Sequence, residues 1–457
     1  MKYLQRTKTR NYITNMTSGA SASLILRFGL PLILANTLQQ LYSMVDTIIL
    51  GRFGGVTGLA VLGTCSWPTW LSVSILTNFS QASSILLAKR FGAGDGEQLR
   101  VATGNVYTSA GALCAFLMIA AQLAAKPLLI WQNTPAEILD QAVLYLRITY
   151  GGIIVLFAYN IYAAFLRALG DSQTPLYAII AATCVNIVLD IWFVAGLEWG
   201  APGAALATVI AQAASAIVCM LRLRTYKQLH ISRRHLAPRW DVLKEYFSLS
   251  VPMLLQSFVI AAGGFFVQTA INSYGSVFAA GMSATVKVFG LLETAAIALA
   301  QSTATFVSQN YGAKEFNRVR RGVRVSVGIS LVIAGILFGS MLLAGKALLS
   351  LFVTAEAIET SWGLLVVMST GLWVMYPMYV LRQSLQALGN AVIPLVAAII
   401  QLAARILVTT YLPLWLGRAG LYYPTVVAWI TSLILIGLVF PSWLRRCEER
   451  SSQETTN

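Results

Sequence analysis

The sequence predicts an all-α polytopic membrane protein, with twelve transmembrane helices in two pseudo-symmetric six-helix lobes around a central cleft. The chain of 457 residues is 57% hydrophobic and only 11% charged, whereas soluble domains carry roughly 25% charged residues. About twelve hydrophobic stretches of at least 18 residues are each long enough to cross a bilayer. The two halves of the chain also repeat one segment plan.

The repeat is visible at matching prolines and glycines. Pro252 follows Pro31 by 221 residues, and Gly312 follows Gly92 by 220 residues. Membrane bundles built from two repeats are typical of secondary transporters, which place their substrate sites between the repeats. The duplication therefore favours transport as the function.

Each predicted helix is a hydrophobic stretch between polar or Gly/Pro-containing segments. In chain order the stretches are 24–50, 59–88, 101–124, 141–168, 175–197, 200–222, 245–273, 277–308, 322–344, 361–388, 392–415 and 419–444. Pro31 and Pro252 lie near the start of the first helix of each half, where a missing amide N–H permits a bend. Pro175 and Pro394 each follow a Leu-Gly pair, so we expect them to begin the fifth and eleventh helices.

The only long polar interruption in the middle of the chain separates the two lobes. We expect an N-terminal tail at 1–23, an N-lobe at 24–222, a linker at 223–244, a C-lobe at 245–444 and a C-terminal tail at 445–457. Because each lobe crosses the membrane an even number of times, both lobes enter from the same side. The pseudo-twofold axis should then run along the membrane normal.

The positive charge is distributed as in a membrane protein. If the N-terminus is cytoplasmic, 24 of the 32 lysines and arginines fall in cytoplasmic segments, which places both termini in the cytoplasm of an inner or plasma membrane protein. This bias explains the net charge of +15 without a nucleic-acid partner. The only histidines, His230 and His235, lie in the linker, and the five cysteines show no metal-binding spacing, so we expect neither an enzyme nor a cofactor.

Acidic residues within the predicted helices are the main functional candidates, because an aspartate at the centre of a membrane helix costs roughly 2.5–3.5 kcal/mol. There are three, at Asp46, Asp190 and Glu293. Gln39 and Tyr42 precede Asp46 by seven and four residues and should share its helix face. One stripe of an otherwise apolar helix is therefore polar.

Four residues of other predicted helices could complete a cation site with Asp46. Asn186 and Asp190 are four residues apart on the fifth helix, while Asn160 and Thr208 belong to the fourth and sixth. Burial favours the neutral form of a carboxyl group and a nearby cation favours its charged form, which is the behaviour of a site loaded by H⁺ or Na⁺. Oxygen atoms of Asp46, Asn186 and Asp190 would suit Na⁺. The alternative is that the neutral polar residues only join membrane helices to one another.

The C-lobe does not repeat this acidic set, since Arg405 occupies the position equivalent to Asn186. Lys287 and Glu293 are six residues apart and do not share a helix face. Glu293 could bind a cationic substrate, or it could pair with Lys287 or Arg405 from another helix. The substrate-cleft candidates are Gln39, Tyr42, Lys287, Glu293 and Arg405.

Several motifs resemble those of the multidrug and toxic compound extrusion (MATE) family. The matching stretches are LQQLYSMVDTIILGRFGG (38–55), YNIYAAFLRALGDSQTP (159–175), NIVLDIWFVAGLEWGAPGAALAT (186–208), FVSQNYGAKEFNRVRRG (306–322) and LQALGN (385–390). The resemblance covers about 24–444. It implies export of amphipathic, usually cationic compounds in exchange for H⁺ or Na⁺, by alternation between outward-open and inward-open arrangements.

The resemblance also assigns roles to individual residues. The cation-site network of DinF-like members is matched by Asp46, Asn160, Asn186, Asp190 and Thr208, and the bend-forming proline by Pro31. We expect a monomer that contacts only lipid and small molecules. The rival hypothesis is a lipid-linked glycan flippase of the same superfold, because Lys287, Arg382 and Arg405 could bind an anionic headgroup if all three converged.

Overall fold

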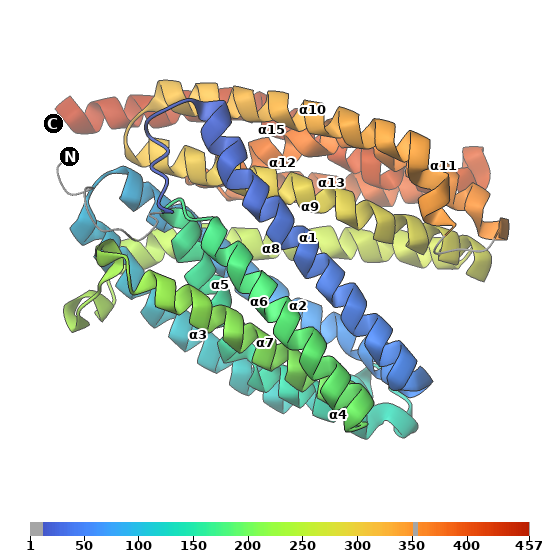
Figure 1. The fold of residues 1–457 in the computed structure, drawn as a ribbon. Helices are drawn as coiled ribbons and strands as arrows, with labels where there is room; N and C mark the ends of the chain where they lie inside the picture. The colour runs from blue at the N-terminus through green and yellow to red at the C-terminus, as the bar shows by residue number, and fades with distance from the viewer. Residues whose placement is uncertain (1–11, 351–354, 457) are drawn as a thin grey trace.

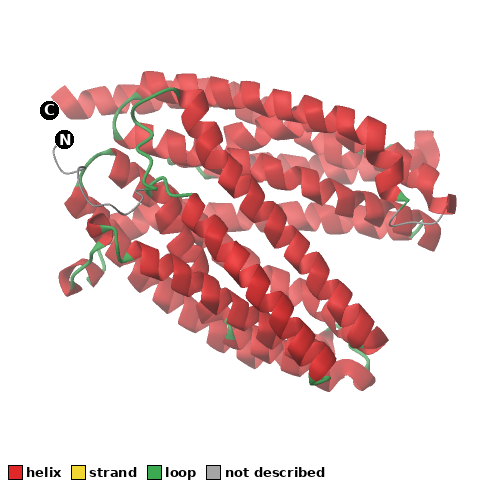
Figure 2. Cartoon of the chain, in the orientation of Figure 1, coloured by secondary structure: helices red, strands yellow, loops and turns green. Residues whose placement is uncertain are grey.

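The computed structural model describes residues 12–350 and 355–456, and throughout this part of the chain the regular structure is helical (Figure 2). The helices are α1 (Ser21–Phe53), α2 (Gly55–Gly92), α3 (Gly96–Trp131), α4 (Ala136–Gly151), α5 (Ile153–Ala168), α6 (Gln173–Asp190), η1 (Ile191–Gly196), α7 (Gly200–Leu223), η2 (Lys227–Leu229), η3 (Arg233–Leu236), α8 (Trp240–Asn272), α9 (Ser276–Gly312), α10 (Phe316–Leu349), α11 (Ala355–Thr370), α12 (Leu372–Ala387), α13 (Val392–Tyr411), α14 (Pro413–Leu416), η4 (Gly417–Tyr422) and α15 (Pro424–Thr456).

The predicted number of membrane spans is confirmed. Within the described residues, ten helices are long and apolar enough to cross a membrane, and two further spans are bent pairs of helices.

The two bent spans are interrupted near their middle. The pair α4 and α5 bends by 40°, and the pair α11 and α12 bends by 47°. The sequence predicted each pair as one uninterrupted helix. The bends occur at Gly152 and Gly371, where an added Cβ would lie 2.4 Å from Val209 and 2.9 Å from Trp429. Glycine therefore lets a neighbouring helix approach each bend closely.

The spans form the two predicted lobes, coloured blue to green and yellow to red in Figure 1. The same packing occurs in both. In the first lobe α6 packs against α1 and α7, and α5 packs against α2 and α7; in the second, α13 packs against α8 and α15, and α12 against α9 and α15. The duplication seen in the sequence thus extends to the choice of helix neighbours.

Each lobe has its own core of buried apolar side chains. The N-lobe core includes Leu50, Leu76 and Leu129 and reaches α8 at Tyr246. The C-lobe core includes Tyr376, which is fully buried. Apolar packing also crosses between the lobes, since Phe28 and Leu32 of α1 share a buried cluster with Phe306 of α9.

The lobes meet near the end of the molecule that carries both termini (Figure 1). An added Cβ on Gly92 would lie 1.9 Å from the Gln309 carbonyl oxygen, and one on Gly312 would lie 1.9 Å from the Lys89 carbonyl oxygen. These two glycines occupy equivalent repeat positions, so the ends of α2 and α9 pack reciprocally. Glu245 adds ion pairs across the same junction, at 2.7 Å from Lys89 and 2.5 Å from Arg90.

The segment before α1 also joins the two lobes. The Met16 backbone N–H donates to Gln309 Oε1 at 2.9 Å, and Gln309 Nε2 donates to the Ala168 carbonyl oxygen at 2.9 Å. Arg318 donates to the carbonyl oxygens of Met16 and Gly19, both at 3.0 Å. Residues 1–11 of the predicted N-terminal tail lie outside the described residues.

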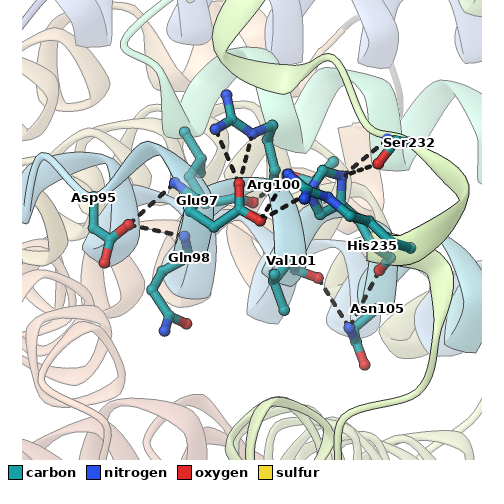
Figure 3. A network of polar contacts seen from close by, with 11 residues as sticks. Asp95, Glu97, Gln98, Arg100, Val101, Asn105, Ser232 and His235 are labelled. Carbon is teal, nitrogen blue, oxygen red and sulfur yellow. Dashed lines mark hydrogen bonds and ion pairs between the residues drawn. The ribbon is translucent and has the colours of Figure 1, made fainter.

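The linker between α7 and α8 is fixed to the start of α3 (Figure 3). His235 is 4% exposed, its Nε2 lies 3.1 Å from Glu97 Oε1, and its Nδ1 accepts a hydrogen bond from the Ser232 backbone N–H. Asn105 Oδ1 accepts from the Arg239 backbone N–H at 2.6 Å. The histidine that the sequence placed in the linker therefore anchors that linker to the N-lobe.

The close approach of Gly92 to Gln309 can be tested by mutation. We expect Gly92→Ala to destabilise the protein by about 1–3 kcal/mol, because the added methyl group overpacks the junction with Gln309. The measurement is the thermal unfolding midpoint of the purified protein in detergent. Gly96→Ala is the matched control, since a Cβ there meets open space. Equal midpoints for the two variants would contradict the close approach.

Candidate functional site

Two carboxyl groups of the N-lobe face each other between α1 and α6. Asp46 comes from α1 and Asp190 is the last residue of α6, and their carboxyl groups are close enough to interact electrostatically. Asn186, one turn before Asp190, lies beside the Asp190 carboxyl group. Asp190 and Asn186 are both 0% exposed, whereas Asp46 is half-buried. The three residues that the sequence proposed for Na⁺ are thus brought together.

The polar atoms of this trio are poorly satisfied by the protein. Among the residues that the structure describes, no regular hydrogen bond reaches Asp46 Oδ1, either carboxyl oxygen of Asp190, or either amide atom of Asn186. Buried polar atoms normally have partners, because an unpaired one loses its hydration without compensation. Most of the unpartnered atoms in this trio are oxygens of side chains that face one another. These oxygens could bind a small cation, or the two carboxyl groups could share a proton.

Tyr42 and Thr208 extend the site towards α7. The Tyr42 hydroxyl donates to Thr208 Oγ1 at 3.4 Å, which is a long hydrogen bond between α1 and α7. Gln39, one turn before Tyr42, is exposed and lines the same small crevice between α1, α6 and α7. Asn160 instead donates from Nδ2 to the Leu156 carbonyl oxygen of its own helix at 2.8 Å.

Two features of the site were not predicted. Tyr145 of α4 lies close enough to Asp46 and Tyr42 to interact with them electrostatically. Nothing in the sequence near Tyr145 signalled this, because its proximity to Asp46 depends on how α4 packs against other helices of the lobe. The second feature is η1, a π-helical turn that begins directly after Asp190, with the Leu197 N–H donating to the Trp192 carbonyl oxygen at 2.9 Å. Such turns are frequent at functional sites.

The C-lobe charges form a separate cluster around Tyr379. The Tyr379 hydroxyl donates to Glu293 Oε1, and the Arg382 guanidinium lies 4.1 Å from the centre of the Tyr379 ring. Arg405 lies near both Tyr379 and Glu293, and its Nη1 donates to the Ile260 carbonyl oxygen at 3.2 Å. Arg382 and Arg405 are each 8% exposed.

Lys287 does not share the environment of these two arginines. Its side chain is exposed on α9, while Arg382 and Arg405 are buried beside Glu293. The three cations therefore do not form the single anion-binding surface that a flippase hypothesis required. Of the five substrate-cleft candidates, Gln39 and Tyr42 belong to the N-lobe. Lys287, Glu293 and Arg405 belong to the C-lobe.

Comparisons with known proteins agree with the duplicated helical architecture. The profile of the MatE family matches residues 31–192 and again residues 252–411. The two matches begin at the paired prolines of the repeat. Together they cover well over half of the chain.

Curated relatives and solved structures match along most of the chain. "Probable multidrug resistance protein YoeA" of Bacillus subtilis (strain 168) is 27% identical over 423 residues, which are 90% of this chain and 91% of that protein. "DNA damage-inducible protein F" of Escherichia coli (strain K12) is 23% identical, with 74% of each chain covered. A structure described as the outward-facing conformation of a multidrug resistance MATE family transporter of the MOP superfamily has a TM-score of 0.89 at 20% identity, covering 97% of this chain and all of that one.

The Tyr379 cluster gives a prediction about Glu293. We expect Glu293→Gln to destabilise the protein by about 1.5–3 kcal/mol, because the charged acceptor of the Tyr379 hydroxyl is lost beside two buried arginines. The measurement is thermal unfolding in detergent, with Lys287→Gln on the same helix as an exposed control expected to change stability little. If Glu293→Gln kept its stability but lost substrate binding, Glu293 would be assigned to substrate binding instead of to stabilising the fold.

Proposed function

This chain belongs to the MatE family of multidrug efflux transporters, and from that premise we propose that it exports amphipathic, usually cationic compounds in exchange for H⁺ or Na⁺. The observation that carries the proposal is the Asp46–Asp190–Asn186 trio. It concentrates two acidic groups and unpartnered oxygen atoms in one lobe of a duplicated membrane bundle. The relative from Bacillus subtilis is named a probable multidrug resistance protein, which supports the substrate class.

The geometry of the trio suggests how ion and substrate compete. Two carboxylates this close repel each other, so the pair is stable only when a proton or a cation lies between them. An unloaded pair attracts a cationic substrate into the bundle. Loading by H⁺ or Na⁺ removes that attraction and favours release. Exchange then requires only that the ion stabilises one arrangement of the lobes and the substrate stabilises the other.

Helix α1 provides a connection from the acidic pair to the lobe junction. It continues unbroken from Ser21 to Phe53, with Pro31 inside it and Asp46 near its far end. Pro31 lacks the N–H that would bond to the Arg27 carbonyl oxygen, so bending there disrupts no hydrogen bond of its own. Close to this point the Ser302 hydroxyl of the other lobe donates to the Ile25 carbonyl oxygen at 2.7 Å. A bend at Pro31 would therefore change contacts between the lobes.

We propose an orientation with both termini in the cytoplasm of the plasma membrane, and a monomer as the working unit. The support is the excess of lysine and arginine in the segments on the terminal side. In the structure, that side is where the two lobes are joined (Figure 1). The arrangement would then be closed towards the cytoplasm.

Replacing either acidic residue should abolish coupling. We expect Asp46→Asn and Asp190→Asn each to lower ion-driven dye efflux from proteoliposomes at least tenfold, because a neutral amide cannot alternate between charged and loaded states. Asp140→Asn, which removes an exposed carboxylate from α4, is the control and should transport normally. Undiminished efflux by both site variants would refute the proposed roles.

Asn186 separates the two coupling ions. We expect Asn186→Ala to weaken Na⁺-driven efflux more than pH-driven efflux, because Na⁺ needs several oxygen ligands whereas a proton needs only a carboxyl group. The measurement imposes the sodium gradient and the pH gradient separately on the same proteoliposomes. Equal losses under both gradients would assign Asn186 a structural role instead.

A further inference from the structure

A groove on the outside of the C-lobe is not used by the proposed exchange. It has a volume of about 660 Å³ and lies between α10 and α15, with Leu381 of α12 among its lining residues. Its other apolar lining residues are Val323, Val327, Gly437, Phe440, Pro441 and Leu444. The α10 residues recur at intervals of three and four, as do those of α15, so each helix presents one continuous face to the groove.

Three arginines are gathered at one end of this groove. Arg320 and Arg324 come from the first turns of α10, and Arg445 comes from α15. Arg320 forms an ion pair with Glu448 at 3.1 Å, which ties the two helices together. Arg324 and Arg445 are both exposed. In the described part of the chain, neither guanidinium group forms a hydrogen bond or ion pair with another residue. Two guanidinium groups therefore border an apolar channel.

The sequence places these arginines at the depth of the lipid headgroups. Residues 325–345, directly after Arg324, contain no charged side chain, and neither do residues 424–444, directly before Arg445. Each stretch is about as long as the roughly 20 residues that cross the hydrocarbon core. Both guanidinium groups therefore lie at the same membrane boundary, on the side of the termini.

We propose that this groove binds one anionic phospholipid from the leaflet on the terminal side of the membrane. The phosphate lies between Arg324 and Arg445, whose planar guanidinium groups can each donate two hydrogen bonds to its oxygens. An acyl chain occupies the apolar channel towards Leu381. A lipophilic cation is disfavoured by the arginines, and a choline headgroup brings its own positive charge to the same place. Basic pockets between membrane helices on the cytoplasmic side are established binding places for acidic headgroups.

Gly437 allows the acyl channel to be tested apart from the charges. A Cβ at this position would meet nothing within 4 Å. Gly437→Leu therefore adds an apolar side chain to the channel from a position where its Cβ meets no other atom, and it leaves every arginine in place. Gly339→Leu is the matched control, because Gly339 also faces open space on α10 but lies far along the helix from the arginines.

The experiment titrates the purified full-length protein in detergent with phosphatidylglycerol and with phosphatidylcholine of the same acyl chains. The readouts are the thermal unfolding midpoint and the number of lipids retained in native mass spectrometry. For the unmodified protein we expect phosphatidylglycerol to raise the midpoint, with one lipid retained. Arg324→Gln combined with Arg445→Gln should raise the half-saturating lipid concentration about 25-fold, from about fivefold for each arginine. Gly437→Leu should abolish the stabilisation.

Four comparisons make the proposal falsifiable. Arg321→Gln combined with Arg446→Gln removes the same charge from the adjacent positions of the same helices, and it should respond to lipid as the unmodified protein does. An equal loss in this control would show that general surface charge is responsible and would overturn the site. The site would also be overturned by equal stabilisation with phosphatidylcholine, by equal stabilisation with inorganic phosphate alone, or by an unchanged response in Gly437→Leu.

Discussion

The energetic penalty for burying carboxyl groups in a bilayer is the constraint on which the rest of this structure depends. An aspartate at membrane depth is unfavourable by several kcal/mol unless it is neutralised or paired. Here Asp46 and Asp190 face each other, and Asn186, rather than a basic residue, lies beside them. In the proposed exchange, a mobile cation or proton neutralises the pair. A fixed lysine or arginine at this point would supply the counter-charge permanently and leave no role for an ion.

The C-lobe shows that alternative outcome of the same duplication. Its equivalent of Asn186 is Arg405, and Glu293 is held by the Tyr379 hydroxyl with Arg405 and Arg382 nearby. The protein itself supplies the counter-charges for Glu293 there. The duplicated helix arrangement thus holds a pair of acidic residues in one lobe and a glutamate accompanied by arginines in the other. That asymmetry is consistent with a coupling mechanism that operates through the N-lobe.

The sequence predicted the architecture well because its signals are those that a bilayer enforces. Long uncharged stretches, paired prolines and a biased charge distribution follow from membrane thickness and orientation, and the helix neighbours repeat as the duplication requires. The bends at Gly152 and Gly371 escaped prediction, because glycine signals a permitted bend but not whether a neighbouring helix exploits it. Tyr145 escaped for a related reason, since its proximity to Asp46 depends on how α4 packs. Asp46 and Asp190 could be proposed as neighbours because acidic residues in apolar helices are rare, and Asn186 because it lies one turn before Asp190.

The contacts between the lobes indicate how a change at Asp46 could reach the opposite end of the molecule. At the terminal end, Gly92 and Gly312 allow backbone contact between the lobes, and Glu245 bridges them electrostatically. The N-terminal segment adds hydrogen bonds from Met16 to Gln309, which in turn reaches Ala168. Apolar packing of α1 against α9 adds to these contacts, since Phe28, Leu32 and Phe306 share one buried cluster. The charged contacts of the junction are partly exposed, so each contributes modestly. In the proposed exchange, ion binding shifts the lobe arrangement by opposing this combined apolar and polar junction.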